Sequence, residues 1–358
     1  MKKILILTAG YGEGHNSAAR GIEAGLARQA PGTQVECHDL FAETYGRPNE
    51  WVRKGYLALI NHWPRSWGVV YRWLDRKTDF DRDFRRFTRL KRHLSDILDR
   101  LQPDIVVSVF PAYPYLLQQV QPNRTCRSVV VVTDSITVNA IWYHCTAEAF
   151  LVPNERSALP LRAAGIDPNK IRTFGFPVNP RFTDLPRRRP PSPTERPRLL
   201  YMINAGTSRA PEITQRLSRL NLDLTVTVGR DEKFRRSIEN AAGDGKVNVV
   251  GWTDRLPELL CQSHVLIGKA GGATVQEAVA AGCPMIINHI VSGQEEGNAQ
   301  LIVETNSGAI AHTPAEVVEQ VERLFRDEAR LWHEWAAHIA QLSRPRASLE
   351  IADFLMTL

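Results

Sequence analysis

The chain has 358 residues, 43% of them hydrophobic, so it is long enough for two globular domains. It has no apolar run near the length of about 18 residues that a membrane span needs, and the run Ile4–Leu7 is too short for a signal peptide. We therefore expect a cytoplasmic protein. Its five scattered cysteines form no C-x-x-C pair, which disfavours a disulfide framework or a zinc site. The formal net charge is +6, and most of the excess falls between Tyr71 and Arg92, where seven Arg and two Lys accompany four Asp.

The N-terminal half alternates short apolar runs with helical patterns. The residues from His15 to Gln29 have the apolar spacing of an amphipathic helix. Runs of branched apolar residues without polar alternation are typical of buried parallel strands joined by right-handed crossovers. The predicted strands are Lys2–Thr8, Val35–Leu40, Asp104–Phe110 and Ser128–Thr133, with weaker ones at Phe150–Val152 and Ile171–Phe174.

One region of this half, residues 48–101, does not fit the alternation. It contains the basic segment and four of the eight tryptophans. Aromatic and arginine side chains together suit a membrane interface, so we expect Trp63, Trp67 and Trp73 to face acidic lipid rather than nucleic acid. For the part from Phe84 to Leu101 we favour the alternative, an ordinary surface helix that packs its apolar stripe on the sheet.

A proline- and arginine-rich stretch, residues 186–197, separates this half from a second α/β pattern. We therefore predict an N-terminal domain (1–185), a linker (186–197), a C-terminal domain (198–342) and a helix (343–358) that returns to the N-terminal domain. Two such units create a cleft between the carboxyl edges of their sheets. The strands predicted in the second unit are Arg198–Ile203, Leu222–Val228, Val247–Val250, Val265–Ile267, Met285–Asn288 and Ala309–Ala311.

The loop after the first predicted strand is glycine-rich and is followed by a histidine. Gly12 and Gly14 lie in this loop, and His15 begins the helix. A histidine at a helix N-terminus is held neutral by the helix dipole, and neutral imidazole is a competent general base. Two alternatives remain: a dinucleotide-binding loop with Glu36 or Asp39 as its acid, and a histidine that only caps its own helix.

The stretch from Gly268 to Glu277 has the pattern of a phosphate-binding site. Gly271 and Gly272 allow close approach to the backbone, and the amides of Ala273 and Thr274 would be unpaired at a helix start. Glu277, one turn on, is placed to reach a sugar hydroxyl. The alternative is that strand, glycine pair and helix form an ordinary α/β turn.

Further polar residues follow other strands of the second half. Amide and carboxylate side chains between Ser292 and Asn298 suit sugar hydroxyls, although they also fit a capping box. The motif Asp79-x-Asp81-x-Asp83 resembles a metal signature, but it lies in a helical segment, so we predict no catalytic metal. The remaining candidates at the cleft edge are Gly206, Thr207, Arg230 and Trp252.

Together these residues resemble the family 28 glycosyltransferases, whose GT-B fold has two Rossmann-like domains with parallel sheets facing each other across a cleft. The similarity is to the monogalactosyl- and glucosyl-diacylglycerol synthases, and also to the enzyme that adds N-acetylglucosamine to the peptidoglycan lipid precursor. It covers nearly the whole chain. The matching stretches are Gly10–Ala19, Thr133–Asp134, Val152–Glu155, Gly175–Phe182, Gly251–Asp254, Lys269–Glu277 and Gly293–Asn298.

The resemblance implies an inverting transfer of a hexosyl group from a UDP-sugar to a membrane lipid hydroxyl, with diacylglycerol as acceptor and no metal or other cofactor. His15 is implied as the base, with Asp134 as the alternative base or orienting residue. The N-terminal domain would bind the lipid acceptor, and the C-terminal domain would bind the UDP-sugar. The start of the helix at Gly272, Ala273 and Thr274 would meet the charge of departing UDP. The other implied roles are ribose binding by Glu277, sugar binding by Gln294 and Glu295, and bracing of the loop by Asn298.

Three departures from the family pattern leave the donor sugar open. The loop Asn204–Ser208 has one glycine where two or three are usual, Ala270 stands where proline is usual, and Ser292 also replaces a proline. We expect the protein to bind peripherally to the inner face of the membrane. The alternatives are a UDP-sugar epimerase of the same architecture, a nicotinamide-dependent oxidoreductase and a non-catalytic nucleotide-sugar binder.

Overall fold

The computed structural model describes residues 1–52, 55, 79–121, 126–191, 195–243, 247–291 and 295–358. The chain divides into two compact units. Unit 1 comprises Met1–Pro180, Val291–Gly297 and Pro345–Leu358, and unit 2 comprises Arg181–Ile290 and Asn298–Arg344.

Unit 1 is built on a six-stranded sheet with the strand order β2-β1-β3-β4-β5-β6. Every neighbouring pair is parallel, as the buried runs of Ile, Leu and Val predicted. The prediction of an α/β fold with parallel strands is therefore confirmed here. The strands are β1 (Lys3–Thr8), β2 (Gln34–Asp39), β3 (Ile105–Ser108), β4 (Arg127–Val131), β5 (Ala149–Val152) and β6 (Ile171–Thr173).

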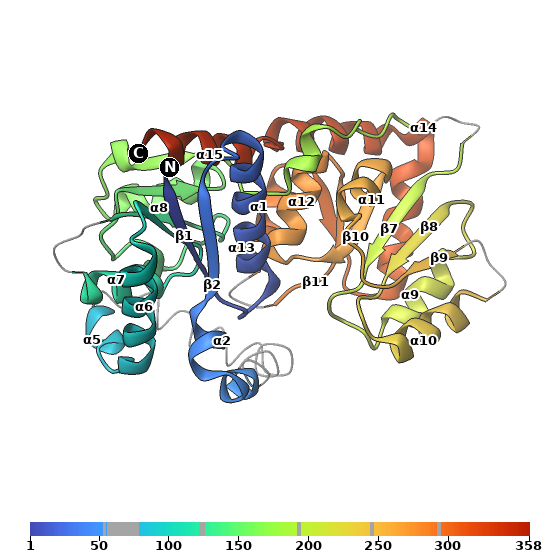
Figure 1. The fold of residues 1–358 in the computed structure, drawn as a ribbon. Coiled ribbons are helices and arrows are strands. Elements are labelled where there is room, and N and C mark those ends of the chain that lie inside the picture. The colour runs from blue at the N-terminus through green and yellow to red at the C-terminus, as the bar shows by residue number, and fades with distance from the viewer. Residues whose placement is uncertain (53–54, 56–78, 122–125, 192–194, 244–246, 292–294) are drawn as a thin grey trace. The chain divides into compact units, whose positions relative to one another are not determined.

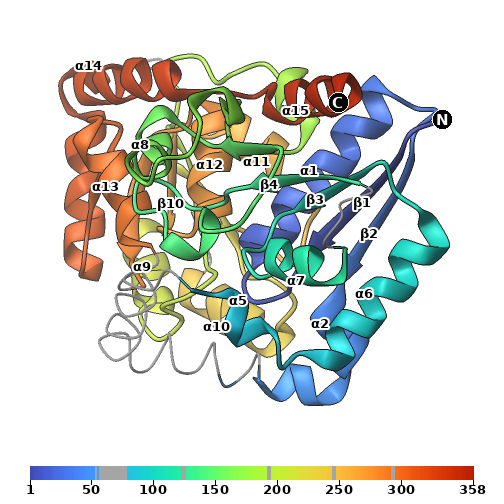
Figure 2. The ribbon, with the colours of Figure 1, turned by 90° about the vertical axis from the view of Figure 1, so that its left-hand side faces the viewer.

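The α-helices of unit 1 are α1 (Glu13–Gln29), α2 (Leu40–Tyr45), α5 (Asp81–Phe84), α6 (Thr88–Leu101), α7 (Tyr113–Val120), α8 (Glu155–Ala163) and α15 (Ala347–Thr357). Helix α6 lies beside α7 (Figure 2) and buries Leu90, Leu94 and Ile97 against the core around β1 and β3. Each such leucine contributes about 1.5–3 kcal/mol by leaving water. The apolar stripe of this segment thus packs on the sheet.

The last helix, α15, packs against the first helix, α1, although the two are at opposite ends of the chain (Figure 1). Their backbones come close at Gly25, where an added Cβ would lie 2.3 Å from the carbonyl oxygen of Ser348. The Ser348 hydroxyl donates in turn to the carbonyl oxygen of Val178. Only a glycine at position 25 permits this approach.

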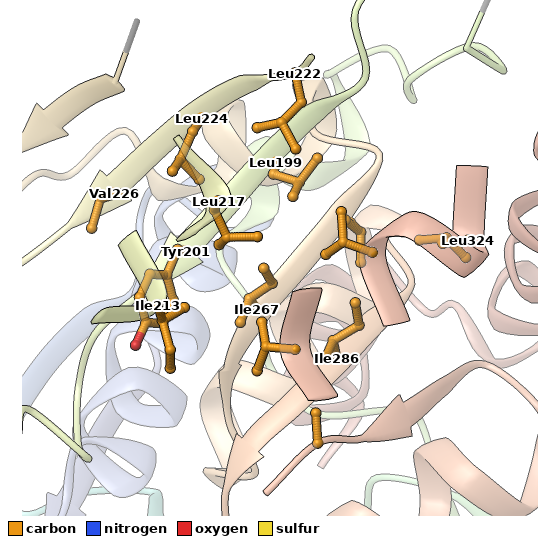
Figure 3. Close-up of a cluster of buried hydrophobic side chains, with 14 of the residues drawn as sticks. Leu199, Tyr201, Ile213, Leu217, Leu222, Leu224, Val226, Ile267, Ile286 and Leu324 are labelled. Carbon is orange, nitrogen blue, oxygen red and sulfur yellow. The ribbon is translucent and has the colours of Figure 1, made fainter. Parts of the chain in front are cut away.

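Unit 2 also has a six-stranded parallel sheet, with the order β12-β11-β10-β7-β8-β9. Its core brings Tyr201, Val226 and Ile267 from the strands against Ile213 and Leu217 of the helix that follows β7 (Figure 3). The strands are β7 (Arg198–Met202), β8 (Asp223–Thr227), β9 (Val247–Val250), β10 (Val265–Lys269), β11 (Met285–His289) and β12 (Gly308–Ile310).

The helices of unit 2 are α9 (Ala210–Leu217), α10 (Glu232–Ala242), α11 (Leu256–Gln262), α12 (Gly272–Ala281), α13 (Glu296–Glu304), which begins in unit 1, and α14 (Pro314–Leu342), which is broken at residues 326–329. Two arginines of the predicted linker bond within unit 2. Arg187 donates to the hydroxyl of Ser343 at 2.7 Å, and Arg188 donates to Nε2 of His264 at 3.3 Å. This part of the linker is therefore held on unit 2.

Replacing Gly25 with alanine should destabilise the protein by about 1–3 kcal/mol, because the new methyl group would force α1 and α15 apart. Gly32→Ala is the matched control, since an added Cβ there meets no atom within 4 Å. Denaturant unfolding measures both variants. If the two variants have the same free energy of unfolding, the close approach at Gly25 does not affect stability.

Candidate functional site

The strand order of unit 1 creates a point where the chain reverses its direction across the sheet. The chain leaves β1 for β2 on one side and returns to β3 on the other. In open parallel sheets, ligands bind outside the carboxyl ends of the strands at such a point. The loop after β1 and the residues after β3 meet there, and they bring His15 to Val109.

The ring of His15, in the first turn of α1, is fixed in one tautomer. Its Nδ1 lies 2.7 Å from the carbonyl oxygen of Val109. A carbonyl oxygen only accepts, so Nδ1 carries the hydrogen, and Nε2 of the neutral ring is left with a free electron pair. The hydroxyl of Thr133 lies 3.2 Å from the same Nδ1 and helps to fix the ring.

His15 is neutral at physiological pH. Removal of the ring from water holds its pKa at about 4, below the usual 6.5, although the hydrogen bond to Val109 opposes this effect. The ring of Phe110 packs edge-on at 5.1 Å between centroids. The arrangement provides a neutral imidazole whose Nε2 can accept a proton.

Asp134 follows β4 and is held by an indole. Its Oδ2 accepts a 2.8 Å hydrogen bond from Nε1 of Trp142, whose ring centroid is 6.0 Å from that of His15. Removal from water raises the pKa of Asp134 to about 6, and the Trp142 bond partly offsets this rise. The structure thus brings the two predicted catalytic residues into one neighbourhood through Trp142, a contact that the sequence did not reveal.

The glycine loop is fastened to the rest of unit 1. Gly12 has φ of 123°, which favours glycine, and an added Cβ at Gly14 would meet no atom within 4 Å. Asp39 accepts from the amide of Gly10 at 2.8 Å and from the amide of Ala42 at 3.0 Å. Both of its carboxylate oxygens are thereby engaged.

Glu36, the other acid of the dinucleotide alternative, is bonded to Arg100 at 2.6 and 3.1 Å. A ribose would have to displace an ion pair from Glu36 or backbone bonds from Asp39. The structure therefore does not favour a nicotinamide nucleotide at this loop.

In unit 2 the chain reverses its direction between β10 and β7, and α12 begins at this point. Its N-cap is Gly271, and no described side chain caps this end. The first-turn amides of Gly272, Ala273 and Thr274 have no acceptor within the helix, so the positive end of the helix dipole is presented to a ligand. Glu277, half-buried, lies in the next turn.

The other predicted nucleotide-binding residues follow neighbouring strands at the same edge of this sheet. Gly206, after β7, has φ of 66°. The guanidinium of Arg230, after β8, lies 4.7 Å from the ring centroid of Trp252, after β9, and this indole is 62% exposed. Thr207 lies in the same exposed loop as Gly206. The edge therefore offers an aromatic platform and a cation at the carboxyl ends of β8 and β9, in the same sheet as strand β10, which leads into α12.

Asn298 and Glu295 both have structural bonds. The buried amide of Asn298 donates from Nδ2 to the carbonyl oxygen of Ala270 at 3.0 Å, and so holds the loop that leads into α12. Glu295, also buried, accepts from the amide of Val291 at 3.0 Å through Oε2. Gln294 and the predicted lipid-facing Trp63, Trp67 and Trp73 lie outside the described residues.

A glycine that the sequence analysis passed over joins two of these segments within unit 1. An added Cβ at Gly297 would lie 2.3 Å from the carbonyl oxygen of Ser135 and 2.5 Å from Oγ1 of Thr137. The segment that carries Glu295 therefore packs directly on the loop that carries Asp134. A glycine two residues after a carboxylate gives no sequence signal of such an approach.

The described part of the chain has neither a metal-binding cluster nor a membrane-spanning helix. No group of three or more His, Cys, Asp or Glu side chains there is arranged to hold a metal ion. Among the same residues, no helix combines the length and apolarity needed to cross a membrane.

Comparison with solved structures identifies the fold. The chain superposes over its full length on the crystal structures of Acinetobacter baumannii MurG (TM-score 0.66, 13% identity, all of that chain) and of the calicheamicin glycosyltransferase CalG4 (TM-score 0.60, 17% identity, 98% of that chain). The fold is therefore GT-B, as predicted.

The family follows from sequence. Residues 15–178 match the model of monogalactosyldiacylglycerol (MGDG) synthase, and residues 201–345 match the glycosyltransferase family 28 C-terminal domain. A probable monogalactosyldiacylglycerol synthase of Glycine max is 28% identical over 99% of this chain and 71% of its own length. The processive diacylglycerol beta-glucosyltransferase of Bacillus subtilis is 25% identical over 99% of this chain and 95% of its own. The chain belongs to the family 28 glycosyltransferases, which confirms the resemblance.

The tautomer and pKa of His15 can be measured directly. Long-range proton–nitrogen NMR correlations should show a neutral ring protonated at Nδ1 at pH 7, with titration near pH 4. The His15→Gln variant assigns the signal. A midpoint near the usual value for histidine, or a ring protonated at Nε2, would contradict the geometry described here.

Proposed function

We propose that this glycosyltransferase transfers a hexosyl group from a UDP-sugar to the hydroxyl of diacylglycerol, with inversion at the anomeric carbon, and so makes a glycosyldiacylglycerol. The observation that carries the proposal is the neutral His15 ring, whose Nε2 is free at the carboxyl edge of the unit 1 sheet. The names of the relatives, which are diacylglycerol galactosyl- and glucosyltransferases, support the acceptor and a hexose donor.

His15 acts as the general base in this proposal. As the acceptor oxygen attacks the anomeric carbon, its proton passes to Nε2, and the ring becomes an imidazolium that still donates from Nδ1 to Val109. Ionised Asp134 stabilises that positive charge at pH above about 6. A base placed in this way contributes about 100- to 10,000-fold to the rate.

The leaving UDP is held by unit 2. Its diphosphate gains negative charge as the glycosidic bond breaks, and the amides at the start of α12 meet this charge without a metal ion. Glu277 accepts from the ribose hydroxyls, Arg230 and the loop with Gly206 and Thr207 border the phosphates, and Trp252 lies by the base. Gln294 and Glu295 hold the sugar, and Asn298 holds the phosphate-binding loop through its hydrogen bond to Ala270.

The lipid acceptor requires a membrane surface, and we propose a peripheral position on the inner face of an anionic membrane. Five exposed arginines on α5, on α6 and in the turn between them support it, and in the described structure their guanidinium groups form no ion pair. Each basic residue near such a surface contributes about 1 kcal/mol. The five are Arg82, Arg85, Arg86, Arg89 and Arg92.

Two variants test the division of roles. His15→Ala should lower the rate of transfer of labelled sugar to diacylglycerol about 100-fold or more, because the base is lost. Its affinity for UDP should stay that of the wild type. Glu277→Ala should weaken UDP binding by about 10- to 100-fold, since a hydrogen bond to a charged group is lost.

His144→Ala is the control, because His144 is an exposed histidine of the same unit. Isothermal titration calorimetry measures the UDP affinity, and extraction of labelled lipid measures transfer. Near wild-type transfer by His15→Ala would rule out His15 as the base. Conversion of the free UDP-sugar without any acceptor would favour an epimerase instead.

Replacing Arg85, Arg86 and Arg89 with glutamine should weaken binding to vesicles with acidic lipid by about 100-fold, because three attractive charges are removed. UDP affinity should not change. The control is the triple glutamine variant of Arg219, Lys233 and Arg236, which are exposed in unit 2. Vesicle flotation measures both, and equal flotation would place the membrane contact elsewhere.

A further inference from the structure

The carboxyl end of β11 in unit 2 carries an irregularity next to the start of α12. Gly268 of β10 pairs with Ile287, but the next residue, Lys269, pairs with His289, so the register shifts by one residue. The skipped residue, Asn288, is buried and donates to the hydroxyl of Tyr201 at 3.2 Å. Such a bulge changes the direction of the side chain that follows it, which here is His289.

The ring of His289 reaches across the end of β10. A Cβ added to Gly206, in the loop after β7, would lie 3.7 Å from Nδ1 of His289. Strand β10 lies between β11 and β7, and two strand spacings span about 9.5 Å. A ring that starts on β11 and contacts the loop after β7 therefore lies over the end of β10.

The proposed phosphate-binding site begins at the end of β10. The amide of Ala270 donates to the carbonyl oxygen of His289 itself at 2.9 Å, and Gly271 and the first turn of α12 follow. Gly206 has the left-handed φ of 66° and no side chain, so its loop can lie against the imidazole. His289 as a residue is half-buried, so it is partly accessible from the solvent.

We propose that the His289 imidazole is a further donor-binding residue that contacts the second phosphate of UDP and distinguishes a nucleoside diphosphate from a monophosphate. This inference rests on the proposed function. An imidazole N–H is a suitable donor to a phosphate oxygen, and such a charge-assisted bond is among the stronger hydrogen bonds in proteins. Beside a helix N-terminus, it adds a side-chain donor to the backbone amides that meet the leaving group.

The contact predicts a loss that is specific to the diphosphate. His289→Leu should weaken UDP binding by about tenfold or more, while UMP affinity stays that of the wild type, because only UDP has the second phosphate. His289→Gln retains an N–H at a similar distance from the backbone and should recover most of the UDP affinity. Calorimetry with UDP and with UMP measures each variant.

His312→Leu is the matched control, because His312 is an exposed histidine just after the neighbouring strand β12. Thermal unfolding establishes that each variant is folded. If His289→Leu does not fold, His289→Asn takes its place, since its amide is one methylene shorter than that of Gln and should lose the contact.

The outcomes separate the inference from the proposed function. A wild-type protein that binds UDP and glycosylates diacylglycerol, with an unchanged ratio of UDP to UMP affinity in His289→Leu, would overturn the inference alone. Equal weakening of UDP and UMP would also overturn it, because the contact would not be with the second phosphate. A wild-type protein that neither binds UDP nor transfers sugar would overturn both.

Discussion

Parallel pairing of the strands is the constraint on which the rest of the structure depends. Because all six strands of each sheet run the same way, their carboxyl ends meet at one edge, and residues far apart in sequence become neighbours. This constraint places His15 against Val109 in unit 1 and the start of α12 beside the loop of Gly206 in unit 2. The direction of the strands therefore determines which residues meet at each edge.

At these edges, hydrogen bonds to backbone carbonyl oxygens fix the groups that the proposed reaction uses. The carbonyl oxygen of Val109 selects the tautomer of His15. The carbonyl oxygen of Ala270 accepts from the side-chain amide of Asn298, and this bond holds the loop before α12. A neutral base and an uncapped helix N-terminus are the two elements that sugar transfer from a nucleotide needs when the leaving diphosphate is met by peptide groups. Family membership and site geometry thus lead to the same class of reaction.

The sequence predicted the strands well because buried parallel strands are short runs of Val, Ile and Leu, as in β1 and β4. It also predicted that the stripe of α6 packs on the sheet, from its three- and four-residue spacing. It could not predict Trp142, Gly297 or His289, whose roles depend on contacts across the sheet edge. For His289 the cause is a one-residue shift of register, which leaves no trace in composition or periodicity.

The most direct test of the account is to incubate the protein with diacylglycerol vesicles and a panel of α-linked UDP-sugars. Mass spectrometry identifies the lipid product, and NMR gives the configuration of its new bond. We expect a hexosyldiacylglycerol with a β-linkage, since a single attack on the anomeric carbon inverts it. An α-linked product, or consumption of the UDP-sugar with no glycosylated lipid, would contradict the account.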